Sequence, residues 1–531
     1  MRLSPDTLPS LRPGAALPNY DRGALTTGIV HLGIGAFHRA HQAVYTDGVL
    51  ARGFGKDAAT WGIAGVSLRS PDTRDALAPQ GGLYTVAVRD AAGERLRVVG
   101  SVTELLVAPE DPAAVLERLT RPSVRVVSLT VTEKGYCHDP ATGALNEDHP
   151  DIVHDLANPG APRSVPGFLV EALARRRAAG VAPFTVLSCD NLPSNGDTAA
   201  GILRRYASLR DPGLGSWFAD AVACPNSMVD RIVPATTDAD RDRVSGLLGL
   251  RDAWPVVTEP FTQWVIEDRF PTGRPAWDWE GAELVADVHP YETMKLRLLN
   301  GSHSTLAYLG YLAGYETVSD AMADAGIARL VRGLMDEEVT PTLRVPPGAD
   351  LARYKDALIE RFRNPALRHR TWQIAMDGTQ KLPQRLLGTI RDRLAAGAPI
   401  DRLALGVAAW MRYVSGVDEA GRPIDVRDPM AARLAELAAE AGPVAERLAP
   451  ALFGLNAVFG DDLPRDPRFT GPVTDALKRL FAEGARATVA GVQAILPRPP
   501  TLTLPRWAGE GTAAASHKLP PPPSGGGSGW G

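Results

Sequence analysis

The first half of the chain alternates short apolar runs with segments of helical periodicity. Four runs rich in valine and isoleucine occupy residues 28–35, 61–68, 124–132 and 184–191. Residues 166–180, just before the last run, repeat their apolar side chains at helical spacing. Apolar runs of this length are typical of buried strands, and strands that alternate with helices form parallel sheets. The pattern predicts an α/β domain.

From about Pro290 the pattern changes to long segments rich in alanine and leucine. Residues 401–417 and 473–496 repeat their apolar side chains at helical spacing, and strand-like runs become rare. Because 531 residues are too many for one core, we expect an α/β domain at 1–289 and a mainly α-helical domain at 290–506. The remainder, 507–531, combines a proline run with a Gly/Ser tract and is predicted to be a disordered tail.

Charge and cysteine content narrow the class of partner. With 57 Lys+Arg and 61 Asp+Glu the formal charge is -4, which gives no electrostatic reason to expect nucleic acid or an anionic membrane. Cys137, Cys189 and Cys224 lie far apart and match neither a disulfide framework nor a cysteine zinc site. No targeting segment and no run of eighteen apolar residues occurs. We expect a cytoplasmic protein with a small-molecule partner, and its oligomeric state is not predicted.

The first apolar run enters a glycine turn and then a segment that we expect to be helical as far as residue 45. Gly33 permits a tight turn, and Gly35 lets backbone N–H groups approach a pyrophosphate whose charge a helix N-terminus stabilises. The third glycine of GxGxxG is missing, since Arg39 or Ala40 stands in its place. An ordinary turn between strand and helix is the alternative for this motif alone. The candidate cofactor-binding residues here are Gly33, Ile34, Gly35, Ala36 and Phe37.

The end of the second run bears on the choice of cofactor. In dinucleotide-binding domains this strand ends near an acidic residue that takes the ribose hydroxyls of NAD, or near an arginine that takes the 2′-phosphate of NADP. Here it ends in "GVSLRSPD", where Arg69 suits a 2′-phosphate and Asp72 suits a ribose. Both residues also fit a solvated loop, so the strand end leaves NAD and NADP open.

Residues 295–304, "KLRLLNGSHS", concentrate polar groups within an apolar helical pattern. The pattern continues from residue 291 to residue 309, although Asn300-Gly301 normally marks a turn. On a regular helix Glu292, Lys295 and His303 fall within roughly 80° of one another, whereas Asn300 lies off that stripe. A distortion at Asn300-Gly301 would bring Asn300 round to the other side chains.

These residue types fit the oxidation of a secondary alcohol without a metal. Such a reaction needs a base for the hydroxyl proton and donors for the developing alkoxide. Lys295 can be the base if its pKa falls from about 10.4 toward about 7 to 8, and asparagine amides can be the donors. Asn191, at the end of the fourth apolar run, lies at the sheet edge where ligands of α/β proteins bind. Spacing alone also fits a solvated Glu292–Lys295 pair, a core histidine and a turn-forming asparagine.

Six blocks follow one another along the chain in this order: "VHLGIGAFHRAHQAVYTD", "VVSLTVTEKGYC", "FTVLSCDNLPSNG", "MVDRIVPAT", "EPFTQWVIEDRF" and "MKLRLLNGSHS". Together they resemble the polyol-specific long-chain dehydrogenase family, which includes mannitol 2-dehydrogenase and fructuronate reductase. The resemblance extends from about residue 27 to about residue 490. The resemblance implies a Rossmann-type N-terminal domain that binds NAD, a mainly helical C-terminal domain and a metal-independent site in the cleft between them. At matching positions Lys295 would be the general base and Glu292 would help to relay the proton. Asn191 and Asn300 would stabilise the oxyanion, and His303 would orient the substrate.

One block, "NPALRHRTWQIAMDGTQKLPQRLL" at 364–387, resembles the fructuronate reductases more closely than the mannitol dehydrogenases. Mannitol dehydrogenases carry a substrate-contacting arginine where this chain has Gln373, although Lys381 is retained. The block is locally basic, with one acid, Asp377, and it also fits a charged helix face and loop. Its candidate substrate-binding residues are Arg368, Arg370, Gln373, Lys381 and Arg385.

The resemblance favours the interconversion of D-fructuronate and D-mannonate. A uronate carboxylate needs a charge partner that a neutral polyol does not, and arginine suits that task, but the sequence does not choose among the arginines. A polyol 2-dehydrogenase such as mannitol dehydrogenase is the alternative within the family. A non-catalytic dinucleotide-binding protein is the alternative from another class.

Overall fold

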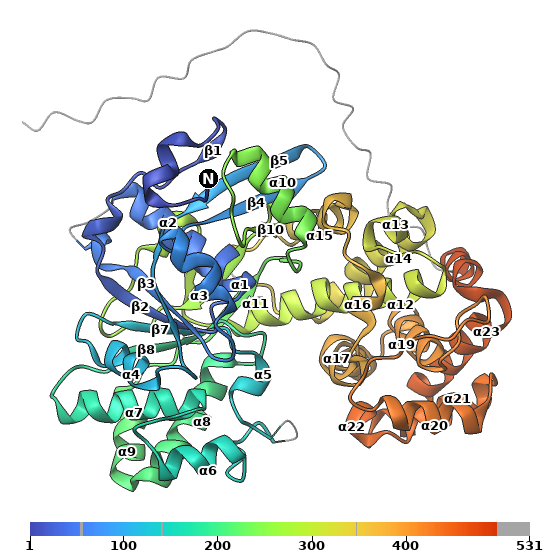
Figure 1. The fold of residues 1–531 in the computed structure, drawn as a ribbon. Helices are drawn as coiled ribbons and strands as arrows, with labels where there is room; N and C mark the ends of the chain where they lie inside the picture. The colour runs from blue at the N-terminus through green and yellow to red at the C-terminus, as the bar shows by residue number, and fades with distance from the viewer. Residues whose placement is uncertain (54–56, 140–141, 347, 496–531) are drawn as a thin grey trace, which may run out of the picture.

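The computed structural model of the chain describes residues 1–53, 57–139, 142–346 and 348–495 (Figure 1). The predicted tail, 507–531, lies outside the described residues. An α/β half is followed by a helical half, and the helical segment 289–312 leads from one into the other (Figure 1).

A five-stranded parallel sheet forms the centre of the α/β half. Its order is β6-β3-β2-β7-β8, and all neighbouring strands are parallel. Because the order runs outward from β2 in both directions, the reversal point where Rossmann-type sheets bind their ligands lies between β2 and β7. The strands are β2 (Thr27–Leu32), β3 (Gly62–Ser67), β6 (Val102–Val107), β7 (Val126–Leu129) and β8 (Thr185–Ser188).

The four predicted apolar runs are confirmed as β2, β3, β7 and β8. The prediction misses β6, which lies at the edge of the sheet. Four of its six side chains are only half-buried, and its sequence includes Thr103 and Glu104, so it lacks a continuous apolar run. An edge strand has one exposed flank, which relaxes the demand for apolar side chains.

The sheet separates two hydrophobic cores, because successive side chains of a strand point to opposite faces. Val30 and Val127 belong to the core that α4, α7 and α8 cover. Ile29 and Val126, their neighbours in sequence, belong to the core that also contains Trp264 and α2. The helices of this half are α1 (Ala36–Ala40), α2 (Gln42–Arg52), α3 (Asp72–Leu77), α4 (Pro112–Thr120), α5 (Thr132–Gly135), α6 (Pro150–Ala157), α7 (Val165–Ala178), α8 (Asn195–Arg210), α9 (Pro212–Ala221) and α10 (Asp238–Leu248).

Two smaller sheets complete the α/β half. One has the order β1-β5-β4-β10 and contains the antiparallel pair β4–β5, and the other has the order β12-β11-β9. Neither was predicted from the sequence. The strands are β1 (Ala15–Ala16), β4 (Tyr84–Asp90), β5 (Gly93–Val99), β9 (Ser227–Asp230), β10 (Val256–Thr258), β11 (Gln263–Glu267) and β12 (Glu283–Val285).

The described residues from 289 onward contain helices and loops and no named strand. α19 packs along α23, which is kinked at Gly484, and α12 packs against α19. A Rossmann-type domain followed by a helical domain is therefore confirmed as the fold. The helices are α11 (His289–Met294), α12 (Ser302–Leu312), α13 (Val318–Ala323), α14 (Ala325–Gly333), α15 (Leu351–Arg363), α16 (Thr371–Ala375), α17 (Gly378–Leu382), α18 (Gly388–Ala395), α19 (Asp401–Val414), α20 (Ala431–Ala441), α21 (Ala445–Phe453), α22 (Asn456–Phe459) and α23 (Pro467–Ile495).

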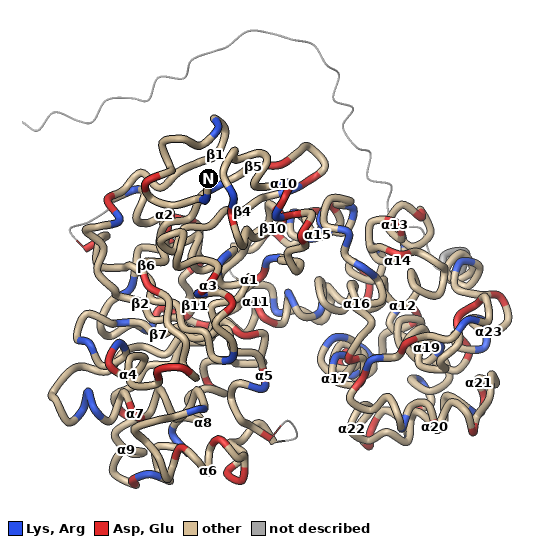
Figure 2. Tube along the Cα trace, in the orientation of Figure 1, with Lys and Arg blue, Asp and Glu red and all other residues tan. Residues whose placement is uncertain are grey.

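Basic and acidic residues are interspersed along both halves (Figure 2). This distribution matches the small formal charge of -4. Within the described part of the chain, no helix is both long enough and apolar enough to cross a membrane.

Candidate active site

The glycine turn lies at the carboxyl end of β2, beside the reversal point of the sheet. Gly33 has φ +92, and a Cβ there would lie 2.2 Å from the carbonyl oxygen of Thr130, so only glycine fits. Ile34 is buried, and its Cδ1 takes the space that a side chain at Gly65 would need. Gly35 is exposed and precedes the first residue of α1, which leaves backbone N–H groups accessible at this turn.

The helical segment after the turn is interrupted at one residue. Ala36 and Phe37 are half-buried in its first turn, as expected. α1 ends at Ala40, His41 has φ -121 and ψ -91, and α2 continues the segment from Gln42 to Arg52. The Tyr84 hydroxyl donates to the carbonyl of Arg39 at 2.7 Å next to this break. The prediction of a helical segment as far as residue 45 is therefore confirmed, with a break at His41 that was not predicted.

The strand end that bears on NAD or NADP lies at the same edge of the sheet. Arg69 and Asp72 follow β3, and both are exposed. The Ser70 hydroxyl donates to the Asp72 carboxylate at 2.8 Å, at the start of α3. Both side chains stay accessible from solvent, so the role of each stays a prediction.

Lys295 is buried where the two halves meet, with 8% of its surface exposed. Its Nζ donates to Oδ1 of Asn191 at 2.8 Å and to the carbonyl oxygen of Val229 at 3.0 Å. Burial lowers the pKa of Lys295, Asp230 opposes this, and Arg385 lowers it further. The lysine is thereby shifted toward the neutral form that a base requires.

Asn191 stands on the loop after β8 and reaches across to the helical segment. Its side chain is exposed apart from the contact with Lys295. Because Oδ1 accepts from Lys295, the amide can donate only through Nδ2. An oxyanion-stabilising role of Asn191 would therefore fall to Nδ2.

Residues Lys295–Gly301 form a π-helix rather than a turn. On an α-helix Lys295 and Asn300 would lie about 140° apart, but hydrogen bonds from i to i+5 make them neighbours one turn apart. Asn300 is half-buried on this segment. Gly301 has helical backbone angles, and a Cβ there would lie 2.7 Å from the carbonyl oxygen of Arg385. The glycine is thus needed for close packing and not for turning the chain.

His303 follows the π-helix and lies among aromatic and basic groups. Its ring stacks on Phe362 at 5.2 Å between centroids and meets the edge of His369 at 5.0 Å. Its Nε2 is buried and has no hydrogen-bond partner among the described residues. Burial holds the pKa of His303 well below its usual value, and His369 and Arg385 add to this. The ring is therefore neutral and has a nitrogen available to a ligand.

Glu292 lies one turn before Lys295 on α11. Its carboxylate accepts from the backbone N–H of Ser194 at 3.1 Å. Burial raises the pKa of Glu292, and the Ser194 hydrogen bond opposes that shift. A carboxyl group with a raised pKa close to a buried lysine is suited to exchange protons with it.

Two residues of the basic block join this cluster. Arg385 donates to the Ser304 hydroxyl at 3.0 Å, and burial lowers its pKa to about 10. Lys381 donates to the carbonyl oxygen of Ile374, and burial lowers its pKa to about 8. Arg385 influences the pKa values of both Lys295 and His303, which places its charge beside them.

The remaining candidates of the block lie at the surface. Arg368 and Arg370 have side chains that are 75% and 60% exposed, and both face Glu316, at 3.9 Å and 3.6 Å. Gln373 is also exposed. Glu316, which lies outside the block in the sequence, is thus a second acid near it besides Asp377. The structure brings Lys381 and Arg385 to the cluster and leaves these three residues outside it.

A buried ion-pair network behind Lys295 was not predicted. Arg361 of α15 pairs with Asp230 at 2.7 Å and with Glu259 at 2.7 Å, and all three side chains are at most 5% exposed. The two acids lie in the blocks "MVDRIVPAT" and "EPFTQWVIEDRF": Asp230 is the last residue of β9, and Glu259 directly follows β10. An acid at the end of an apolar run is the sequence signal from which both residues could have been predicted as candidates.

Asp190, next to Asn191, was also missed. Its carboxylate accepts from the backbone N–H groups of Val131 and Thr132 at 3.1 Å and 2.8 Å, and from the Tyr136 hydroxyl at 2.8 Å. It therefore holds the loop after β7, whose Thr130 touches the glycine turn. Of these two neighbouring residues, Asp190 thus supports the loop at the candidate cofactor edge, and Asn191 contacts the candidate catalytic lysine.

The arrangement resembles known proteins along nearly its whole length. Residues 27–279 match the Mannitol dehydrogenase Rossmann domain, and residues 287–481 match the Mannitol dehydrogenase C-terminal domain. An uncharacterized oxidoreductase of Escherichia coli (strain K12), YeiQ, is 51% identical over 470 residues, which cover 88% of this chain and 95% of that protein. D-mannonate oxidoreductase of the same strain is 50% identical over 481 residues, covering 90% and 98%.

A solved structure is similar over the same length. The ternary complex of Pseudomonas fluorescens mannitol 2-dehydrogenase with NAD and D-mannitol has a TM-score of 0.84 and 40% sequence identity, and the match covers 93% of this chain and 100% of that one. Both halves and their order thus match one group of oxidoreductases, and the chain belongs to the mannitol dehydrogenase family.

Proposed function

We propose that the chain is an NAD-dependent dehydrogenase of secondary alcohols that interconverts D-fructuronate and D-mannonate without a metal ion. The observation that carries the substrate is Arg385, a half-buried guanidinium whose charge lowers the pKa values of Lys295 and His303. Among the described residues it forms no salt bridge, and its hydrogen bond goes to the neutral hydroxyl of Ser304. A charge that is partly removed from water without an ionic partner is costly, and a ligand carboxylate would compensate it through a bidentate pair.

The α/β half fits NAD. Gly33 and Gly35 shape the turn that would hold the pyrophosphate, and Arg69 and Asp72 lie at the strand end that would meet the ribose. The related P. fluorescens enzyme is a complex with NAD. When bound, NAD takes a hydride from the alcohol carbon or returns it to the ketone.

The side chains of the cluster supply the proton chemistry. In the oxidation direction neutral Lys295 takes the proton of the substrate hydroxyl, and the amides of Asn191 and Asn300 donate to the oxygen as its negative charge grows. His303, kept neutral by burial, orients that oxygen through Nε2. Glu292, whose pKa burial raises, accepts the proton from Lys295 and passes it on.

The test compares kcat/KM for fructuronate and fructose in the wild-type protein and in two matched variants. Arg385→Met removes the half-buried guanidinium, and Arg370→Met removes an exposed one from the same block. Loss of a buried carboxylate's partner costs about 2 to 5 kcal/mol, so Arg385→Met should lower kcat/KM for fructuronate about 30-fold to several thousand-fold. Arg370→Met should change it less than about twofold.

The outcomes separate the substrate from its recognition. If the wild-type protein handles fructose as well as fructuronate, the uronate assignment fails. If fructuronate is preferred but Arg385→Met leaves that preference intact, the activity stands and the role of Arg385 fails.

Mannitol 2-dehydrogenase activity is the second candidate, because the P. fluorescens enzyme with D-mannitol matches this chain with a TM-score of 0.84. A preference for fructose and mannitol over the uronate pair would establish it. A protein that binds NAD but turns over neither pair would instead be a non-catalytic dinucleotide-binding member of the family.

A further inference from the structure

Ser194 connects the loop that carries Asn191 to the helix that leads to Lys295. Its backbone N–H donates to the Glu292 carboxylate at 3.1 Å, and its hydroxyl lies 2.9 Å from Nε2 of His289. Both partners belong to α11, which continues directly into the π-helix that begins at Lys295. Through Ser194, two hydrogen bonds therefore tie this loop of the α/β half to α11, in addition to the bond between Lys295 and Asn191.

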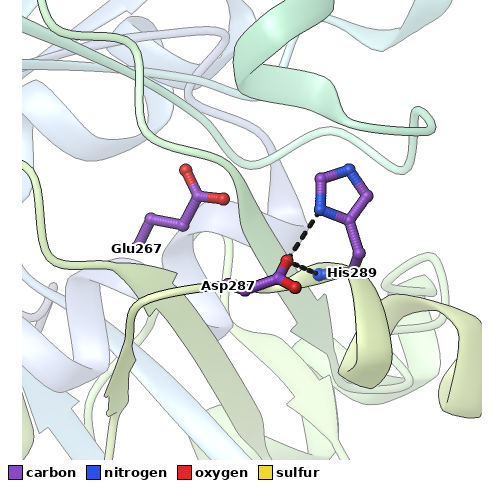
Figure 3. Close-up of side chains that lie close together, drawn as sticks. All are labelled: Glu267, Asp287 and His289. Carbon is purple, nitrogen blue, oxygen red and sulfur yellow. Dashed lines mark hydrogen bonds and ion pairs between the residues drawn. The ribbon is translucent and has the colours of Figure 1, made fainter. Parts of the chain in front are cut away.

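The His289 ring is held in turn by Asp287 (Figure 3). Oδ1 of Asp287 accepts from the backbone N–H of His289 at 3.0 Å and lies 2.8 Å from its Nδ1. Because a carboxylate only accepts, Nδ1 carries a hydrogen, and Nε2 of the neutral ring accepts from the Ser194 hydroxyl. The three residues thus form one chain of hydrogen bonds.

Glu267 lies beside this pair, and ligand-type atoms of the three residues come within 4.8 Å of one another (Figure 3). The Glu267 carboxylate already accepts from Asn226 and from Arg269. His289 is engaged through both ring nitrogens. The three residues are therefore engaged in hydrogen bonds and do not form an open metal-binding site.

The loop is held at a second point, on the other side of Asn191. Asn195 donates through Nδ2 to the carbonyl oxygens of Asp190 at 3.0 Å and Ser227 at 2.9 Å. Ser194 itself has φ 44 and ψ 54, a left-handed conformation that is uncommon and strained for a residue with a side chain. Such strain persists where surrounding contacts impose it, and here the contacts with α11 do so.

We propose that Asp287, His289 and Ser194 form a positioning clamp that sets the separation of Asn191 and Lys295. The proposal rests on the proposed roles of Asn191 and Lys295 in the reaction. The side chains of Asp287 and His289 are each 52% exposed, so they are not part of a hydrophobic core. A catalytic pair is sensitive to such a clamp, because a displacement of about 1 Å can cost about 10²-fold in rate.

The test uses variants that break the Ser194–His289 bond from either side. Ser194→Ala and His289→Ala should each lower kcat about 10-fold with little change in KM for NADH, since the groups of the cofactor edge are untouched. The double variant should be no slower than the slower single variant, because both remove one bond. His289→Gln, which keeps an acceptor, should restore most of the rate. Ser216→Ala on α9, whose hydroxyl donates within its own helix, is the control and should match the wild type.

Amide hydrogen exchange of residues 189–195 gives a readout without substrate. Both single variants should speed exchange there about tenfold or more, because the loop loses one of the two hydrogen bonds that Ser194 forms with α11. Unchanged exchange and unchanged kcat in both variants would overturn the clamp, and so would additive losses in the double variant. If the wild-type protein turned over none of the substrates, the proposed function would fail, and hydrogen exchange would still decide on the clamp.

Discussion

Nζ of Lys295 donates a hydrogen bond of 2.8 Å to Oδ1 of Asn191, although the two residues are 104 positions apart and belong to different halves of the molecule. The contact aligns the lysine and fixes which end of the amide can donate. It also means that the candidate base and one candidate oxyanion donor are assembled only when the two halves dock. Folding and catalysis are therefore linked at this pair.

Lys295→Met should abolish turnover, with a loss of kcat of at least about 10²-fold, because a general base contributes about 10²-fold to 10⁴-fold. In the wild-type protein, oxidation should speed up as pH rises through the pKa of Lys295, since the neutral amine is the active form. Burial lowers that pKa, so the midpoint should lie below the usual value of about 10.4. The measurement is kcat/KM for oxidation as a function of pH.

Lys381 is the matched control for this pH profile, because burial also lowers its pKa, to about 8. Lys381→Gln should keep the rising limb, although it weakens substrate binding. Two outcomes would show that a residue other than Lys295 is the base. One is that the rise of kcat/KM with pH disappears in Lys381→Gln, and the other is that Lys295→Met keeps more than about a tenth of the wild-type kcat.

Gly301→Ala should destabilise the protein by about 1 to 3 kcal/mol, because its Cβ would lie 2.7 Å from the backbone oxygen of Arg385. Gly201→Ala is the control: this glycine lies within α8, and a Cβ there meets nothing within 4 Å. That change should be neutral or stabilising by up to about 1 kcal/mol, since alanine is the better helix former. Denaturant unfolding of both variants is the measurement, and equal effects would contradict the packing argument.

Arg361→Met should lower the free energy of unfolding by about 3 to 5 kcal/mol, because it leaves Asp230 and Glu259 buried without their cation. Arg370→Met removes an exposed arginine whose nearest acid, Glu316, is 3.6 Å away, and should cost less than about 1 kcal/mol. Urea unfolding compares the two variants. A loss in Arg361→Met no larger than in Arg370→Met would show that the network adds little to stability.

NAD should be preferred to NADP, as family membership favours, although Arg69 is exposed at the strand end where a 2′-phosphate would lie. The measurement is kcat/KM for both reduced cofactors with one substrate. Arg69→Ala should leave the NADH value unchanged within about twofold. A preference for NADPH that Arg69→Ala abolishes would show that this arginine accepts the phosphate.

Local patterns predicted much of the architecture. Buried parallel strands must be apolar on both faces, so β2, β3, β7 and β8 are visible as valine-rich runs. The edge strand β6 and the strands of the two small sheets do not need apolar side chains on both faces, so they were not predicted. The break at His41 was not predicted either, because no glycine or proline marks it in the local sequence.

Family resemblance in the sequence singled out Lys295, Asn191 and His303, and the glycine turn followed from a local rule, since Gly33 must adopt a positive φ. Tertiary structure alone decided which basic residues join the site: Arg385 is half-buried and its charge acts on Lys295, whereas the side chain of Arg368 is 75% exposed and faces Glu316. Spacing cannot distinguish them, because burial and pairing depend on segments far away in the chain. The π-helix was likewise visible only in the tertiary structure, where Gly301 packs close to the backbone of residue 385, and side chains one π-turn apart share a face that α-helical spacing would separate.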